Sequence, residues 1–240
     1  MNYKKEMDFF DHLEELRWCF IKSLLSIIIG ALATYVFFDE LLFFLIQPVK
    51  SLDINLQVLK VTSMFLIKVS ISFLGGFVIS MPVVYFQIWS FISPIFNFRR
   101  KLFLFSTILF STVFFLFGVI FCYYMVIPLS LIFFTSIKFT LIEVNYNFTL
   151  NGYLYFISGL LVATGFIFQL PILSVIGTRI GVITPAFLRY YRSHAIVIFL
   201  IFGAILTPPD PLSQFLIFIP LVFLYELSII ISWIFRKEIV

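Results

Sequence analysis

The chain has 240 residues, of which 62% are hydrophobic and only 12% are charged. A soluble globular domain carries about 25% charged and about 45–50% apolar residues, so this composition excludes a soluble fold and predicts an integral membrane protein. The formal net charge of +4 is expected to report membrane orientation, and we expect no nucleic-acid partner.

Six hydrophobic segments predict an all-α membrane protein with six transmembrane helices in a single polytopic domain, residues 1–240. A helix needs about 20 apolar residues to cross a core roughly 30 Å thick. Residues 1–19 form an acidic cytoplasmic tail. The predicted spans that follow are about 20–38, 64–88, 102–127, 152–177, 195–206 and 212–235.

The fifth and sixth spans are predicted to form a short helical hairpin. Residues 195–206 would cover only roughly 18 Å at 1.5 Å per residue, and the prolines of the sequence TPPDP directly after them stop the helix. The sixth span is long enough only if Gln214 and Pro220 are buried. In the alternative, Tyr190–Ser193 extends the fifth span inward, which brings Arg189 and Arg192 toward lipid at a cost.

Lysine and arginine predict the orientation. Of the 16 basic residues, twelve lie in the tail and at the very start of span one, between spans two and three, between spans four and five, and after span six. Basic residues collect on the inner side of a membrane, so both termini are predicted to be inside. Among the outer residues, Lys68 is expected to extend its ammonium group to the membrane surface.

Two longer connections lie on the outer side. Asp39–Ser63 alternates charges with apolar patches and carries Pro48, which predicts a bent amphipathic segment. Ile127–Asn151 begins with Pro128 and predicts a partly structured cap over the outer face.

Several polar residues inside the spans require a physical reason. Glu226 lies ten residues before Arg236 and thus near the middle of the membrane. It either contacts other spans or a partner, or it is a protonated carboxyl bonded to a neighbouring helix. Gln169 either satisfies the carbonyl that Pro171 frees or bonds to a partner helix. Gln87, which comes after Pro82 in the second span, has the same two interpretations.

No catalytic constellation is found in the sequence. It contains no phosphate-binding loop, no zinc-protease motif and no nucleophile elbow. We therefore expect no enzyme activity, no metal site and no cofactor. His194, at the inner end of span five, is expected to have a structural role.

The acidic stretch Asp11–Arg17 precedes the first span. Read as a helix, it places one apolar stripe on a single face, formed by Phe9, Leu13, Leu16 and Phe20. Glu14 can pair with Arg17, three residues on. Glu15 has Asp11 four residues before it and Cys19 four residues after it, and so no cationic helical neighbour. Glu15 is therefore predicted to be available to an outside cation.

These motifs together resemble the TatC family, the multi-span receptor subunit of the twin-arginine protein translocase. The resemblance covers the whole chain and rests on six motifs in order: His12–Arg17, Gln47–Val49, Met81–Pro94, Phe168–Pro171, Leu206–Gln214 and Tyr225–Leu227.

The resemblance implies a receptor for twin-arginine signal peptides of folded precursor proteins. It implies single-span TatA and TatB partners, a homo-oligomer within a receptor complex, and export driven by the proton-motive force. The implied signal-binding residues are Glu15, Glu14, Asp11, Arg17 and Phe91. The polar contacts with partners or between spans are expected at Gln169, Glu226, Gln214, Asp210, Pro48, Pro82 and Gln87.

One position departs from the family pattern. Relatives usually carry a glutamate after the Pro94 motif, whereas this chain has Arg100 there. A basic residue repels an arginine pair, so the second arginine is predicted to bind Asp11 or Glu14. Two other functions stay open: a small-solute secondary transporter, and an assembly subunit that no longer binds signals. The expected location is the bacterial inner membrane, with a mitochondrial or thylakoid membrane as the alternative.

Overall fold

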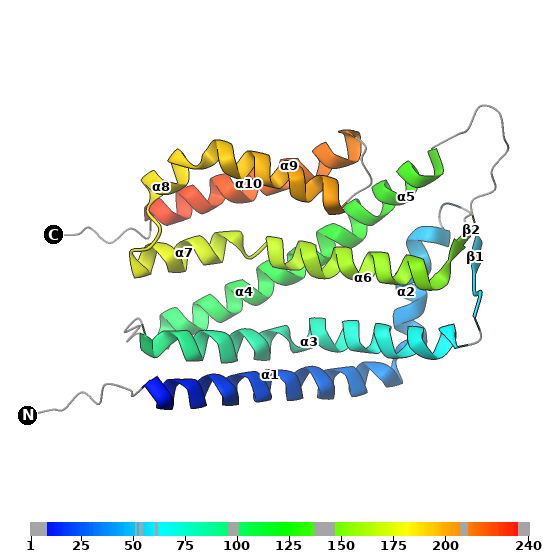
Figure 1. Cartoon of the computed structure of the whole chain (residues 1–240), viewed down its shortest axis with the longest axis horizontal. Helices are drawn as coiled ribbons and strands as arrows, with labels where there is room; N and C mark the ends of the chain where they lie inside the picture. The colour runs from blue at the N-terminus through cyan, green and yellow to red at the C-terminus, as the bar shows by residue number, and fades with distance from the viewer. Residues whose placement is uncertain are drawn as a thin grey trace, which may run out of the picture. The chain divides into compact units, whose positions relative to one another are not determined.

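The structure is a computed structural model that describes residues 9–50, 52, 55–60, 62–95, 101–136, 147–206 and 211–234. The described residues are nearly all helical (Figure 1). The chain divides into two compact units. The first comprises residues 1–41 and 68–112, and the second comprises residues 42–67 and 113–240.

The elements follow one another along the chain as α1 (Phe9–Val36), α2 (Phe38–Lys50), β1 (Asn55–Gln57), α3 (Ser63–Ile95), α4 (Lys101–Phe121), the π-helical η1 (Cys122–Val126), α5 (Ile127–Ser136), β2 (Asn147–Thr149), α6 (Leu150–Ile167), α7 (Leu170–Ile180), α8 (Pro185–Tyr190), α9 (Arg192–Leu206) and α10 (Pro211–Ile234).

Each of the six hydrophobic segments lies in a helical part of the chain, with bounds that differ from the predicted ones. Among the residues that the structure describes, four helical stretches are long and apolar enough to cross a membrane, namely His12–Val36, Ser63–Ser93, Leu102–Thr135 and Leu150–Ile180. Two shorter apolar helical stretches follow, Arg192–Ala204 and Phe218–Ile234. The short fifth span is confirmed, because α9 has only 15 residues.

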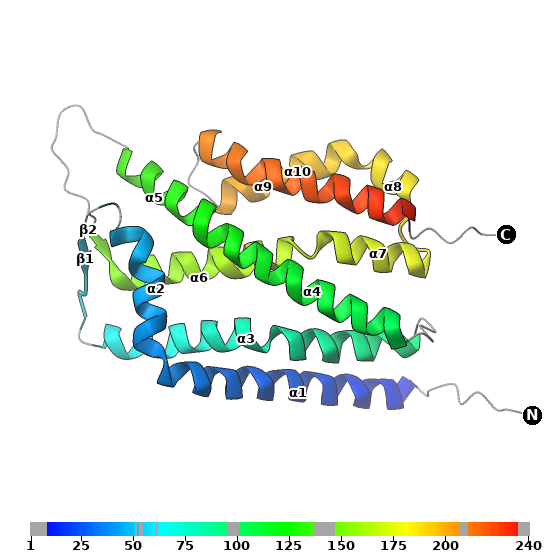
Figure 2. The same cartoon turned by 180° about the vertical axis from the view of Figure 1, so that it is seen from behind.

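The third span is longer than predicted. Pro128 was expected to begin a loop, yet α4 continues through η1 into α5 as one helical run (Figure 2). A proline removes a backbone donor and crowds the preceding turn. The π-helical turn before Pro128 absorbs this defect, since the Ile127 N–H reaches back five residues to the Cys122 carbonyl.

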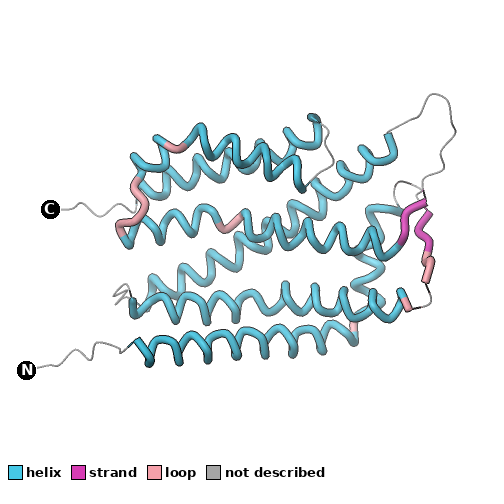
Figure 3. The backbone as a smooth tube through the Cα atoms, viewed as in Figure 1, coloured by secondary structure: helices cyan, strands magenta, loops and turns pink. Residues whose placement is uncertain are grey.

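The fourth span is interrupted, which the hydrophobic pattern did not predict. It breaks at Phe168 and Gln169, where α6 ends and α7 begins (Figure 3). The Gln169 N–H turns back to the Phe166 carbonyl at 2.9 Å. Pro171 lies at the start of α7, where its missing N–H costs no helical hydrogen bond.

The connection from Asp39 to Ser63, predicted as a bent amphipathic segment, contains most of the helix α2, with Pro48 inside it. It also contains β1, which was not predicted. β1 pairs in parallel with β2, with Leu56 opposite Phe148. Strands of three residues are too short to show the alternation on which a prediction depends.

In the second unit, α10 packs against α7 and α9 (Figure 1). Polar side chains join α10 to α7. Ser174 of α7 donates to the Ser228 carbonyl at 3.3 Å, and the hydroxyls of Thr178 and Ser232 bond to each other. Polar bonds of this kind join helices in lipid, where burial of apolar surface gives no preference for protein over lipid.

Candidate functional site

The acidic stretch before the first span is helical, as predicted, because α1 begins at Phe9 and runs without a break to Val36. Glu14 pairs with Arg17 at 3.2 Å, and both side chains are about three-fifths exposed, at 63% and 61%. An exposed pair of this kind contributes only about 0–1 kcal/mol. Arg17 therefore engages Glu14 weakly and can exchange it for another partner.

Glu15 has a polar helical neighbour that the spacing argument did not consider, His12. The Nδ1 atom of His12, three residues earlier, lies 3.5 Å from the Oε2 atom of Glu15. That oxygen is buried, and among the described residues it has no hydrogen-bond partner. The side chain as a whole is 38% exposed. Glu15 thus presents a half-sheltered carboxylate, with one oxygen buried beside His12 and part of the side chain exposed to solvent.

His12 also connects α1 to the end of α3. Its ring stacks on Phe91 with a centroid separation of 4.3 Å and an interplanar angle of 12°. Phe91 is one of the predicted signal-binding residues, and the structure brings it together with Glu15 through His12. Sequence reasoning missed this role because nothing in the local pattern shows that His12 faces a ring on another helix.

The end of α3 is fixed in turn against α4. The indole Nε1 of Trp89 donates to the Ser111 hydroxyl at 3.0 Å, and both side chains are buried. An apolar groove of about 530 Å³ lies between these helices, lined by Pro82, Val83, Phe86, Ser90, Leu104, Phe105 and Ile108. The predicted residue Pro82 belongs to this groove, and Gln87 is half-buried nearby on α3.

Some of the predicted site residues cannot be placed. The Asp11 side chain, Arg100 with the rest of the connection at 96–100, and Asp210 lie outside the described residues.

Glu226 contacts a neighbouring helix, which agrees with the first of its two sequence interpretations, although the residue it contacts was not predicted. The Nε atom of Arg192, at the start of α9, lies 2.7 Å from the Oε1 atom of Glu226 on α10. The contact is an ion pair without the alignment of a hydrogen bond. The carboxylate is thus paired with a cation from the start of α9, as expected for a charged group within a membrane span.

The other predicted polar residues lie at points where helices break or meet. Gln214 of α10 donates to the Leu200 carbonyl of α9 at 2.8 Å, and so joins the two helices of the hairpin. Gln169 is buried at the break between α6 and α7. Pro48 lies within α2. Lys68 lies over the rings of Tyr35 and Phe38, with distances to the centroids of 4.4 and 5.3 Å.

Known proteins share this arrangement over nearly the whole chain. The family described as Sec-independent protein translocase protein (TatC) matches residues 11–220. The TatC protein of Carboxydothermus hydrogenoformans is 33% identical over 95% of this chain and 93% of its own length. TatC of Aquifex aeolicus is 35% identical over 92% of this chain and 93% of its own.

A solved structure agrees with the sequence comparisons. The crystal structure of a twin-arginine translocase receptor, TatC, superimposes with a TM-score of 0.81 at 33% identity. It covers 94% of this chain and 100% of the solved chain. The all-helical, six-span membrane fold is therefore shown for this chain, and the chain belongs to the TatC family of Sec-independent protein translocase proteins.

Proposed function

We propose that this protein is the signal receptor of a twin-arginine translocase, and that Glu15 binds an arginine of the signal peptide at the inner end of α1. The protein would assemble with single-span TatA and TatB subunits and with further copies of itself, in the inner membrane of a bacterium. Export of the folded precursor would be driven by the proton-motive force.

The observation that carries this proposal is the state of the Glu15 carboxylate. One of its oxygens is buried without a hydrogen-bond partner among the described residues, while the side chain stays accessible from solvent. A guanidinium group can bond to both carboxylate oxygens in one plane, whereas a lysine acts as a point charge. A half-sheltered carboxylate therefore favours arginine more than a fully exposed one, whose pairs are worth about 0–1 kcal/mol.

The second arginine of the signal is proposed to bind Glu14 or Asp11. Glu14 already holds Arg17 in a weak, exposed pair, and an incoming guanidinium could replace Arg17 there without loss of charge balance. Arg17 would then be released to solvent. Glu14 or Asp11 would thus take the place of the glutamate that relatives usually carry after α3, where this chain has Arg100.

The test compares two glutamates on the same helical turn. A labelled twin-arginine peptide is photo-cross-linked to membranes that contain the protein, its Glu15→Gln variant or its Glu14→Gln variant. Loss of the Glu15 charge should weaken binding by about tenfold or more, and loss of the Glu14 charge by less, since an ion pair to a sheltered group is worth more. The same peptide with Lys-Lys in place of Arg-Arg should bind poorly to all three.

Equal cross-linking of the arginine and lysine peptides to the unmodified protein would sink the receptor proposal. The remaining alternative would then be an assembly subunit that no longer binds signal peptides. Solute uptake by proteoliposomes that contain this chain alone would instead support a secondary transporter.

A further inference from the structure

Helices α1 and α3 meet within the first unit along a seam of small residues. Ser80 of α3 donates to the Ser26 carbonyl of α1 at 2.7 Å. In the opposite sense, the hydroxyl of Thr34 of α1 donates to the Ser72 carbonyl of α3. The seam residues recur every four positions on each helix: Ser26, Gly30 and Thr34 on α1, and Ser72, Gly76 and Ser80 on α3.

At the centre of the seam the two backbones touch. A Cβ atom added to Gly76 would lie 2.5 Å from the Cα of Ala31 and 2.6 Å from the carbonyl carbon of Gly30. A Cβ atom added to Gly30 would lie 2.8 Å from the Gly76 carbonyl oxygen. These neighbours are backbone atoms and cannot rotate away, so the contact requires glycine at both positions.

The seam fixes the register of the two helices. Each step of four residues forward on α1 is met by a step of four residues backward on α3, so the helices are antiparallel and are held at three successive levels. Glu15 lies 15 residues before Gly30 on α1 (30 − 15 = 15), and Phe91 lies 15 residues after Gly76 on α3 (91 − 76 = 15). Both stretches rise roughly 22 Å along their helices.

Glu15 and Phe91 therefore lie at the same level of the first unit. The stacking of His12, one turn before Glu15, on the Phe91 ring agrees with this register. A slip of α1 against α3 by a single helical turn, about 5.4 Å, would separate the two rings. Apolar surface alone does not prevent such a slip, because lipid covers it as well as protein does.

We infer that Gly30 and Gly76 are positioning residues for signal recognition, which lock α1 and α3 in the register that places Glu15 beside the His12–Phe91 stack. This inference rests on the proposed function, because it assigns the seam a role in binding the twin-arginine peptide. The glycines act about 22 Å from the carboxylate and touch no ligand.

The experiment uses Gly76→Ala, with Gly159→Ala as the matched control. Both add one methyl group to a helical glycine of a span, but nothing lies within 4 Å of a Cβ at Gly159. The register is read in full-length protein from thiol cross-linking of the pair His12→Cys and Phe91→Cys. Folding of the second unit is read from the pair Thr178→Cys and Ser232→Cys, and the native Cys19 and Cys122 are replaced by serine and alanine in both sets.

Peptide binding is measured separately, in protein that keeps His12 and Phe91. Gly76→Ala is expected to lower the cross-link between positions 12 and 91 several-fold and to weaken twin-arginine peptide binding by about tenfold. The cross-link between positions 178 and 232 should persist, which separates a defect of the seam from unfolding of the whole protein. Gly159→Ala should leave all three readouts unchanged.

A second variant keeps the inference testable if Gly76→Ala does not fold. Thr34→Val combined with Ser80→Ala removes both crossing hydrogen bonds without added volume, and is expected to change the same two readouts in the same direction. Unchanged cross-linking at positions 12 and 91, with unchanged peptide binding, would overturn the inference. If the unmodified protein binds no twin-arginine peptide, the proposed function fails, while the cross-link still decides whether the seam sets the register.

Discussion

The Tyr123 hydroxyl donates a 2.7 Å hydrogen bond to the Phe44 carbonyl, the one carbonyl of α2 that Pro48 deprives of its helical partner. A carbonyl in an α-helix accepts from the N–H four residues later, and Pro48 has no N–H. The rings of Phe44 and Tyr123 also stack, with centroids 4.1 Å apart. The π-helical η1 carries Tyr123 to this position.

This relationship predicts a coupling between Tyr123 and Pro48. Tyr123→Phe should lower the free energy of unfolding by about 1 kcal/mol, because it leaves the Phe44 carbonyl unsatisfied. In a Pro48→Ala background the helix supplies its own donor, so the same substitution should cost much less. Unfolding of the four proteins of this double-mutant cycle in detergent measures the coupling.

Tyr153→Phe is the matched control. Its hydroxyl donates to the adjacent Leu45 carbonyl at 2.7 Å, but the helical partner of Leu45 is Val49, which has an N–H. The effects of Tyr153→Phe and Pro48→Ala should therefore add. Equal coupling energies for the two tyrosines would show that Pro48 is not the reason for the Tyr123 contact.

The stack of His12 on Phe91 predicts a recognition defect at a residue outside the expected signal-binding set. His12→Ala should weaken binding of a twin-arginine peptide by about 3–10-fold, the factor that corresponds to one aromatic contact. His12→Phe keeps the stack but loses the nitrogen that faces Glu15, so its effect should be smaller. Fluorescence titration of solubilised protein with a labelled peptide gives the affinities.

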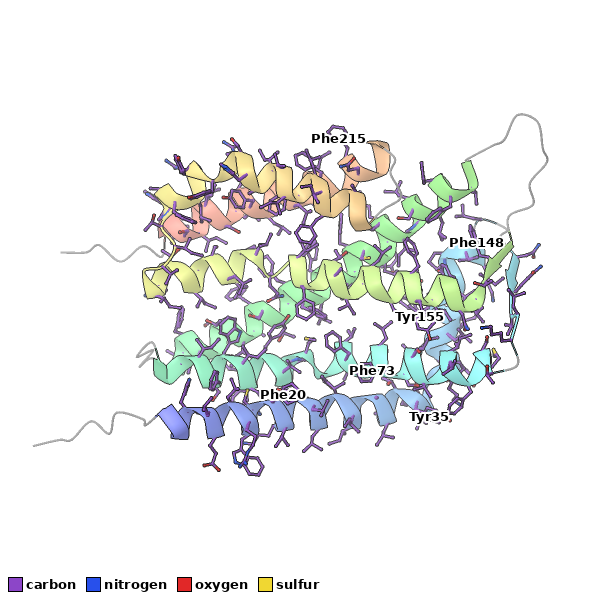
Figure 4. All side chains as sticks on the ribbon, viewed as in Figure 1. Phe20, Tyr35, Phe73, Phe148, Tyr155 and Phe215 are labelled. Carbon is purple, nitrogen blue, oxygen red and sulfur yellow. The ribbon has the colours of Figure 1, made fainter. Side chains whose placement is uncertain are left out.

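Phe20→Ala serves as the comparison for His12→Ala. Phe20 lies on the same helix (Figure 4) and is 69% exposed, and neither of the two rings of the stack is its own. Its replacement should leave peptide affinity unchanged. A similar loss in both variants would mean that aromatic residues on α1 act through the membrane and not through the stack.

The ion pair of Arg192 with Glu226 predicts that these charges hold the inner end of the last hairpin. The side chains are 56% and 35% exposed, respectively, so the large effects of buried pairs do not apply. Glu226→Gln should lower the free energy of unfolding by about 1 kcal/mol. The exchanged pair Arg192→Glu with Glu226→Arg should recover most of this loss, as judged by the unfolding midpoint.

Arg189→Gln provides the reference for Arg192. Arg189 is exposed on α8, and its charge forms no ion pair with the described residues. Its loss should shift the midpoint little. If the exchanged pair is no more stable than Glu226→Gln alone, the geometry of the pair and not its charge is what matters.

The sequence predicted those features that are determined within a single helix. Span number, the short α9 and the amphipathic α2 follow from local hydrophobicity and from prolines, because lipid requires each span to satisfy its own backbone. The helical acidic stretch and the pairing of Glu14 with Arg17 follow in the same way from spacing along a single helix.

Contacts between helices could not be read from that pattern. Lipid-facing and helix-facing residues are equally apolar, so hydrophobicity does not reveal which face of α3 meets α1. A proline within an apolar segment can be accommodated by a π-helical turn, as before Pro128, or by a break in the helix, as before Pro171. The local sequence does not show which of the two occurs.

The sequence by itself determined the membrane setting, the six spans and the position of Glu15 at the start of the first one. Only the tertiary structure decided that His12 links Glu15 to Phe91, that Arg192 pairs with Glu226, and that Gly30 and Gly76 set the register between α1 and α3. The physical reason is that these contacts join residues far apart in the chain, and their energies depend on angles and distances that packing alone sets.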